Sequence, residues 1–264
     1  MSITIAALWR EGRDLAESHA ATAVPVAAAF MFLPQVLRAV IAAPPATQSD
    51  IGGGDVVASL IVVALAFIGQ ATIAAIMLGG RDGPYNVADS LRRAAGLLPR
   101  LLLIVLMLAI AALPLVFVLG VVAVLVMGPD KVGDAKNLSQ TAGLLFVPVI
   151  AVFAYVGARL FPLFPVLVAE TPSARGALRR SWQLTRPSPW TFVGFTLSAL
   201  LAIMFLTTLI TMVAGGLLGL LLGSGSSLGQ LLTLTFATLA GTAIGVIIIG
   251  ASVAAYRGLA SESV

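Results

Sequence analysis

The chain has 264 residues, of which 59% are hydrophobic and only 10% are charged, and its formal net charge is +4. Soluble domains usually carry about 25% charged residues, so this chain lacks the polar surface to face water on every side. It has no cysteine and one histidine, His19, which excludes disulfides, a cysteine nucleophile and a cysteine or histidine metal site. The composition predicts an integral membrane protein, with no metal and no cofactor.

Six apolar stretches are long enough to cross a bilayer, which needs about 20 residues per helix. In chain order they cover residues 20–43, 55–79, 98–127, 142–169, 190–222 and 229–255. They are continuously apolar, without the alternation of a barrel wall, so we expect an all-α fold of six transmembrane helices. The third and fifth stretches exceed the bilayer thickness, which predicts a kink at Pro114 and a break between Gly215 and Gly223.

The arginines fall almost entirely on one side of these helices. The loops 1–19, 80–97, 170–189 and 256–264, with Arg100 at a border, hold eleven arginines, whereas the opposite loops hold only Lys131 and Lys136. Such an asymmetry marks the cytoplasmic side. Because heavy use of Arg and Ala hints at a bacterial genome, we expect a multi-pass protein of the bacterial inner membrane with both termini cytoplasmic. The topology alone accounts for the basic charge, so we expect no nucleic-acid partner.

Three of the cytoplasmic segments have an amphipathic pattern. In segment 171–186, at 100° per residue, one face carries Ala174, Ala177, Leu178, Ser181, Trp182, Leu184 and Thr185, and the other carries Arg175, Arg179, Arg180, Gln183 and Arg186. Segment 86–98, with Arg92 and Arg93 on its polar face, and the N-terminal segment follow the same design. The pattern is typical of interfacial helices whose guanidiniums reach lipid phosphates, with Trp182 at headgroup depth.

The amphipathic segments recur at nearly even spacing. Leu8, Leu91 and Leu178 mark a common register, separated by 83 and 87 residues, and residues 90–93 echo residues 177–180. A fixed period is typical of repeat architecture. We therefore predict a single membrane domain, 1–264, built as a pseudo-threefold repeat of helix–span–span units at about 1–82, 83–170 and 171–264. The alternative is that loops rich in arginine and leucine simply look alike.

Several stretches in the second half carry a family resemblance: Ala158-Arg159-Leu160-Phe161-Pro162, residues 165–170, residues 177–186 with Trp190, and Ala255-Tyr256-Arg257-Gly258-Leu259. Together, over about 155–200 and 255–259, they resemble the membrane domain of some glycerophosphodiester phosphodiesterases and of YciC-like bacterial membrane proteins. In that family the phosphodiesterase chemistry belongs to a separate soluble barrel, which these residues do not include. The resemblance therefore implies a fold and a membrane location, and it implies no activity or catalytic residue.

Ionisable groups inside spans cost about 2.5–3.5 kcal/mol on insertion scales and are functional candidates by default. Only Arg38 and Arg159 qualify. Arg38 lies near the end of the first span, where its side chain can reach the outer headgroups. Arg159 lies about ten residues inside the fourth span, and we expect a carbonyl, Gln70, a water or an anion as its partner. It is either an anion site for a lipid phosphate or a structural arginine bonded to carbonyls near Pro162 and Pro165.

The chain shows no combination of nucleophile, base and orienting group, and no phosphate-binding loop, so we expect no enzymatic activity. We expect its basic interfacial helices to engage anionic lipid headgroups or a membrane protein partner. The candidate residues are Arg159, Arg92, Arg93, Arg179, Arg180, Trp182 and Arg186. The alternative is a transporter or lipid-translocating channel with an anion site at Arg159, although the lack of carboxylates within the spans argues against coupling to protons or sodium.

Overall fold

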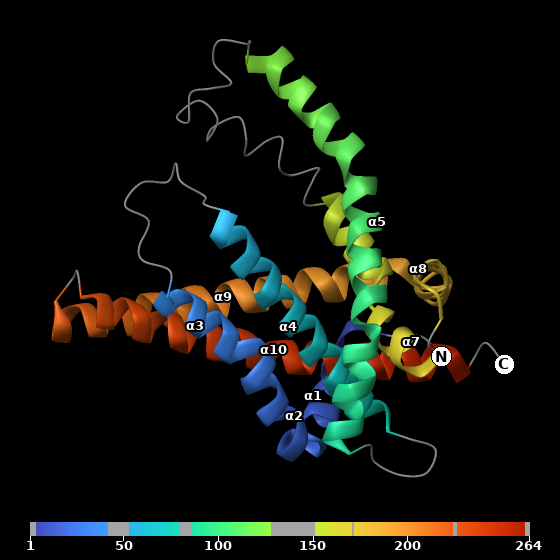
Figure 1. Ribbon diagram of the computed structural model, residues 1–264, viewed down its shortest axis with the longest axis horizontal. Coiled ribbons are helices and arrows are strands. Elements are labelled where there is room, and N and C mark those ends of the chain that lie inside the picture. Colours follow the sequence, from blue (N-terminus) through green and yellow to red (C-terminus); the bar gives the residue numbers. More distant parts are fainter. Residues whose placement is uncertain are drawn as a thin grey trace.

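The computed structural model describes residues 4–41, 53–79, 86–127, 151–170, 172–223 and 226–261. Every regular element in these ranges is a helix (Figure 1). Six of the described segments are long and apolar enough to cross a membrane: Ala20–Ile41, Val57–Leu78, Val87–Leu115, Ala151–Glu170, Pro189–Leu222 and Ser227–Ser261. The predicted all-α class and the six candidate spans are therefore confirmed, while residues 142–150 of the expected fourth span lie outside the described ranges.

The first span is built from three consecutive helical pieces, which follow the amphipathic helix α1 (Ile5–Ser18). These pieces are α2 (Ala20–Ala27), the π-helical turn η1 (Ala28–Phe32) and α3 (Leu33–Ile41). Pro34 has no N–H to donate to the preceding turn, and a π-helical turn is one way to accommodate that loss without ending the helix. The span therefore continues through Pro34.

Helix α4 (Gly53–Leu78) ends in a fully capped turn. Gly79 follows with φ +67°, a left-handed conformation that suits glycine. Arg257, from the end of the chain, donates to the carbonyl oxygens of Met77 and Leu78. These are carbonyls that a helix end leaves without an intrahelical donor. The cap joins the end of α4 to the last helix.

Helix α5 (Val87–Met127) runs without interruption through Pro99 and Pro114. We expected segment 86–98 to form a separate interfacial helix. It is instead the beginning of a 41-residue helix. Its buried stripe has helical spacing and consists of Ser90, Ala94, Leu97, Leu101 and Ile104. Because this stripe continues past Pro99, packing against the core holds both halves of α5 in one helix.

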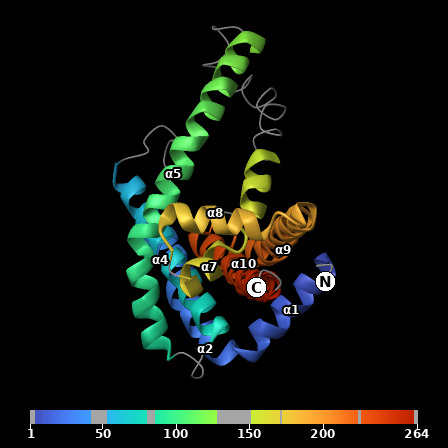
Figure 2. The same cartoon turned by 90° about the vertical axis from the view of Figure 1, so that its right-hand side faces the viewer.

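The fourth span is broken near its middle. Residues 151–159 are helical, residues 160–162 form a turn, and α7 (Leu163–Glu170) follows. Pro162 cannot donate to the carbonyl of Ala158, which instead accepts from the N–H of Phe161 at 3.3 Å. After α7 the chain continues into α8 (Ala174–Leu184), whose N-cap is Ser173. Figure 2 shows α8 crossing over α7 between α5 and α9.

The last two spans, α9 (Pro189–Leu222) and α10 (Ser227–Ser261), form a long hairpin. The expected break between Gly215 and Gly223 is absent, because α9 is continuous to Leu222 and only then ends at Gly223, with φ +92°. Gly215 lies against Thr233 of α10. Gly215 therefore allows close packing between these two helices, whereas a Cβ atom at Gly216 or Gly219 would meet nothing within 4 Å.

The helices converge at one end of the molecule and diverge at the other (Figure 1). We call the region around α1, α7, α8 and the last turns of α4 and α10 the convergent end. Its core contains Leu8, Leu167, Phe192 and Ala255, all nearly inaccessible. Both termini lie at this end, whereas the tips of α3, α5 and the α9–α10 hairpin point away from it. The site described below belongs to the convergent end.

Helix α1 is fixed to this end by a glycine-to-glycine crossing with α10. A Cβ atom added at Gly250 would lie 2.5 Å from the carbonyl oxygen of Gly12, and one added at Gly12 would lie 2.7 Å from the carbonyl oxygen of Ile247. Such separations are too short for any side chain, so only glycine permits this approach.

We expect Gly250→Ala to destabilise the protein by about 1–3 kcal/mol, because the added methyl group must push α1 away from α10. Thermal unfolding in detergent, followed by tryptophan fluorescence, measures the loss. Gly241→Ala on the same helix is the matched control, since its Cβ would meet nothing within 4 Å. Equal melting temperatures for the two variants would contradict the crossing.

Candidate functional site

Helix α8 has a buried face and an exposed charged face, although Trp182, which the sequence placed on the apolar face, is 41% exposed. Its buried residues are Ala174, Ala177, Ser181 and Leu184, with Thr185 just beyond its end, whereas Arg175, Arg179 and Arg186 are exposed. The buried face contacts α5, α7 and α10. Three of its residues are alanine or serine, which allow close packing between helices. The face thus packs against the protein, which differs from the expected insertion into the membrane interface and leaves the charged face outward.

Helix α1 also packs its apolar face against the rest of the protein. Leu8 and Gly12 are buried, and Ile5 contacts Gly194 of α9. The indole N–H of Trp9 donates to Ser198 Oγ at 3.1 Å, and the Trp9 ring lies 5.1 Å from that of Phe195. The polar residues of α1 point away from these contacts. Both short amphipathic helices therefore present mainly charge at the surface of the convergent end.

On α5 and in the α8 region, four arginines of this surface are exposed and make no hydrogen bond or ion pair within the described residues. We call them the collar arginines: Arg92 of α5, Arg175 and Arg179 of α8, and Arg186 just after α8. Arg93 is exposed next to Arg92. Helices α5 and α8 contact each other, so the two groups of charges are borne by neighbouring helices. Of the arginines predicted for headgroup binding, Arg92, Arg179 and Arg186 are thus exposed and make no hydrogen bond or ion pair within the described residues, so their guanidiniums are accessible to a ligand.

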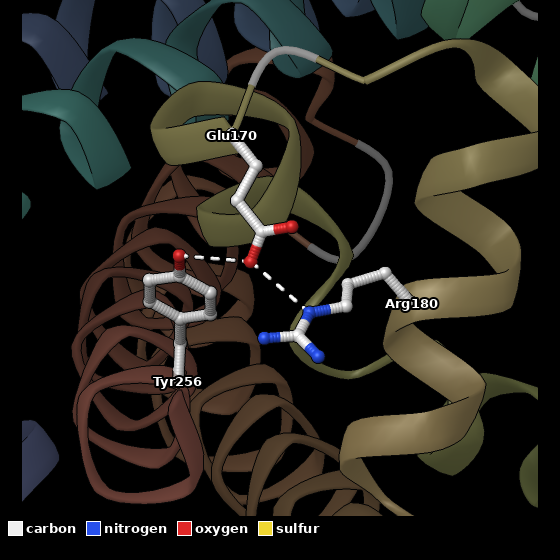
Figure 3. Close-up of polar contacts among 3 residues, drawn as sticks. All are labelled: Glu170, Arg180 and Tyr256. Carbon is white, nitrogen blue, oxygen red and sulfur yellow. Dashed lines mark hydrogen bonds and ion pairs between the residues drawn. The ribbon is translucent and has the colours of Figure 1, made fainter. Parts of the chain in front are cut away.

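Arg180 has a different environment from the collar arginines. Oε1 of Glu170 accepts a hydrogen bond from Arg180 Nε at 3.2 Å and another from the Tyr256 hydroxyl at 3.1 Å (Figure 3). This Glu170 cluster joins the end of α7 to α8 and α10. The Glu170 and Arg180 side chains are each 32% exposed, and pairs so open to solvent contribute at most about 1 kcal/mol. We infer that Arg180 positions α8 rather than serving as an open headgroup contact.

Arg159 is held in a cage of aromatic side chains. Its Nε and Nη2 donate to the Tyr155 hydroxyl at 3.1 and 3.0 Å. Its guanidinium carbon lies 4.8 Å from the Trp182 ring centroid and 5.3 Å from that of Tyr155. The residue is only 8% exposed, and a desolvated cation–π contact of this kind is worth about 2 kcal/mol. Its Nη1 is buried without an acceptor among the described residues.

This environment differs from what the sequence suggested for Arg159. The turn at 160–162 brings the end of α8 against Arg159, whose carbonyl accepts from the Thr185 hydroxyl at 3.3 Å. Its partners among the described residues are the Tyr155 hydroxyl and the rings of Tyr155 and Trp182, and neither a carbonyl nor Gln70 bonds it there. Gln70 instead lines a separate apolar cavity of about 320 Å³, together with residues such as Ser252.

Sequence reasoning missed Tyr155, Glu170, Tyr256 and Arg257 as residues of this site. Tyr155 could have been found, because it lies four residues before Arg159 and so shares its helix face. Glu170, Tyr256 and Arg257 stand in the stretches that carry the family resemblance, but their contacts join segments far apart in the chain. No local pattern indicates such pairs.

Comparisons with known proteins agree with the resemblance. The model of one family, described as the membrane domain of glycerophosphoryl diester phosphodiesterase, matches residues 136–257. The match includes Arg159, the collar arginines of the α8 region and all of the Glu170 cluster. A search of curated proteins and a search of solved structures found no match. The family match and the six apolar segments together indicate a multi-pass membrane protein.

We expect Arg159→Met and Trp182→Leu to be energetically coupled, because each change removes one half of the same cation–π contact. A double-mutant cycle on unfolding in detergent should give a coupling of about 1–2 kcal/mol. Arg159→Met paired with Trp190→Leu is the control cycle, since Trp190 lies outside the cage. Simple additivity in both cycles would show that the cage contributes nothing to stability.

Proposed function

We propose that this protein is a non-enzymatic component of the bacterial inner membrane that engages anionic lipid headgroups through its collar arginines. One observation carries the proposal: Arg92, Arg175, Arg179 and Arg186 are exposed and make no hydrogen bond or ion pair within the described residues. Arginines that served only to hold the fold would be paired, as Arg180 and Arg257 are. Exposed guanidiniums next to a membrane have lipid phosphates as their nearest anions.

Two exposed tryptophans support a position of this surface at headgroup level. Trp182 is 41% exposed, and Trp190, at the start of α9, is 77% exposed. Tryptophan is enriched where the hydrocarbon meets the headgroups. Arg186 lies between the two in the chain, and the apolar span of α9 begins directly after it. Arginine side chains at this level can contact lipid phosphates while they remain at the protein surface.

The attraction would be electrostatic rather than hydrophobic. Because the apolar faces of α1 and α8 are buried against other helices, they add little to membrane binding. Each arginine near an anionic surface contributes about 1 kcal/mol, and this contribution falls with salt. The proposed role is thus to gather anionic lipids around the convergent end, with both chain termini on the cytoplasmic side. We further propose that the protein has no catalytic residue of its own.

We expect Arg92/Arg175/Arg179/Arg186→Gln to abolish a preference for anionic lipid. Spin-labelled phosphatidylglycerol and phosphatidylcholine in lipid nanodiscs measure that preference directly. The wild-type protein should retain phosphatidylglycerol several-fold better at low salt, since each charge adds about 1 kcal/mol. The glutamine variant should retain both lipids equally.

The matched control replaces the same four arginines by lysine, which keeps the charge. This variant should behave like the wild type, because a charged surface and not a bidentate geometry is proposed to act. If the glutamine variant kept the full preference, the proposal would be wrong. A wild-type protein without any lipid preference would instead favour a protein partner for this surface.

A second candidate function is anion or lipid translocation with a site at Arg159. The observation that favours it is the buried Nη1 atom, which has no acceptor among the described residues. An anion could supply the missing acceptor, because a buried unpaired donor costs about 1–3 kcal/mol. The aromatic cage opposes this function, since it already compensates much of the charge.

This second candidate predicts that Arg159→Lys lowers flux in proteoliposomes at least tenfold while the protein still folds. Lysine keeps the charge but cannot reproduce the planar stacking or its donor geometry. Fluorescent lipid scrambling and radiolabelled phosphate uptake are the two measurements. Absence of flux from the wild-type protein in both would eliminate the translocation function without affecting the lipid-collar proposal.

A further inference from the structure

The end of the molecule opposite the collar has a groove between α3 and α4. It encloses about 560 Å³, and its walls include Leu33 and Leu37 of α3 and Ile61 and Leu65 of α4. Leu33, Leu37 and Ile61 are exposed although they are large and apolar. The lining residues contain one charged side chain, Arg38, and otherwise carry apolar side chains. The groove is thus apolar along its length, with a single cation.

Arg38 stands in the last turn of α3, close to the outer end of the groove. Its side chain is exposed and makes no hydrogen bond or ion pair within the described residues. A charged group at this depth is costly unless it reaches a headgroup or pairs with an anion. Its position on the groove wall places it beside whatever fills the apolar space. The combination requires an occupant with an anionic head and an apolar tail.

The length of the groove matches one leaflet of a bilayer. Its lining on α3 and the preceding turn extends from Ala29 to Ile41, a rise of about 18 Å at 1.5 Å per residue. One leaflet contributes about half of a hydrocarbon core that is about 30 Å thick. The lining is therefore long enough for an acyl chain that starts at headgroup level and runs toward the bilayer centre.

We propose that the α3–α4 groove is a binding site for one phospholipid, with an acyl chain along Leu33, Leu37 and Leu65 and the phosphodiester on Arg38. The site lies in the leaflet opposite the collar arginines, because the tips of α3 and α4 point away from the convergent end (Figure 1). It is independent of the proposed collar function. Water cannot fill so apolar a groove favourably.

The test uses native mass spectrometry of the detergent-purified protein titrated with phosphatidylglycerol. The collar arginines are first replaced by glutamine, so that only binding away from the collar is counted. In this background we expect one tightly held lipid. Arg38→Gln should weaken its binding about fivefold, the factor for loss of one charge beside a phosphate. Arg38→Lys keeps the charge and should bind nearly as well as the parent.

A second variant tests the contribution of the apolar groove separately from that of Arg38. Ala58→Trp places a large ring in the groove while Arg38 remains, so it should also reduce binding. The equivalent change at Leu209, on α9 and away from this groove, is the control and should leave binding intact. Unchanged binding in Arg38→Gln, or in Ala58→Trp, would overturn the site. Full competition by soluble glycerol phosphate would also overturn it, because a site for a free phosphate does not need the groove.

Discussion

The convergent end depends on one missing hydrogen-bond donor, the backbone nitrogen of Pro162. Without it the fourth span cannot continue as a regular helix, and the chain turns at 160–162 before α7 begins. That turn carries α8 back across the bundle, where Thr185 bonds the carbonyl of Arg159 and Trp182 covers its guanidinium. A straight helix would keep the Tyr155 hydroxyl as the partner of Arg159 but would lose the Trp182 ring that covers its guanidinium. The break and the buried arginine are therefore explained together, because the turn supplies the Trp182 ring.

The break also sorts the arginines into two groups with different roles. Arg159, Arg180 and Arg257 are committed to the fold through an aromatic cage, a carboxylate and the end of α4 respectively. The collar arginines lie on α5, on α8 and just after α8, are exposed, and make no hydrogen bond or ion pair within the described residues. Composition cannot make this distinction, since every arginine contributes equally to a positive-inside count. The distinction matters for function, because only an unpaired guanidinium can bind a phosphate without first breaking an internal contact.

The sequence was sufficient for properties that depend on local periodicity. The six spans follow from run length, and the buried and exposed residues of α8 follow from 100° spacing, as Ala177 and Arg179 show. Properties that depend on contacts between distant segments were missed. The Glu170–Tyr256 bond joins residues 86 apart, and the aromatic cage needs the turn before Trp182 can reach Arg159. The continuity of α5 through Pro99 was also missed, because tertiary packing of its buried stripe outweighs the local preference of proline to end a helix.

The threefold repeat remains a prediction. The burial pattern can be compared with it position by position. The buried positions of α5 and α8 coincide at a separation of 87 residues, the spacing that the arginine pairs suggested: Ser90 with Ala177, Ala94 with Ser181, and Leu97 with Leu184. Helix α1 departs from this register by one residue, because its buried positions Leu8 and Gly12 correspond to Ser90 and Ala94. A shift of one residue rotates a helix by about 100°, and the buried positions of α1 include Gly12, which lies against Gly250 of α10.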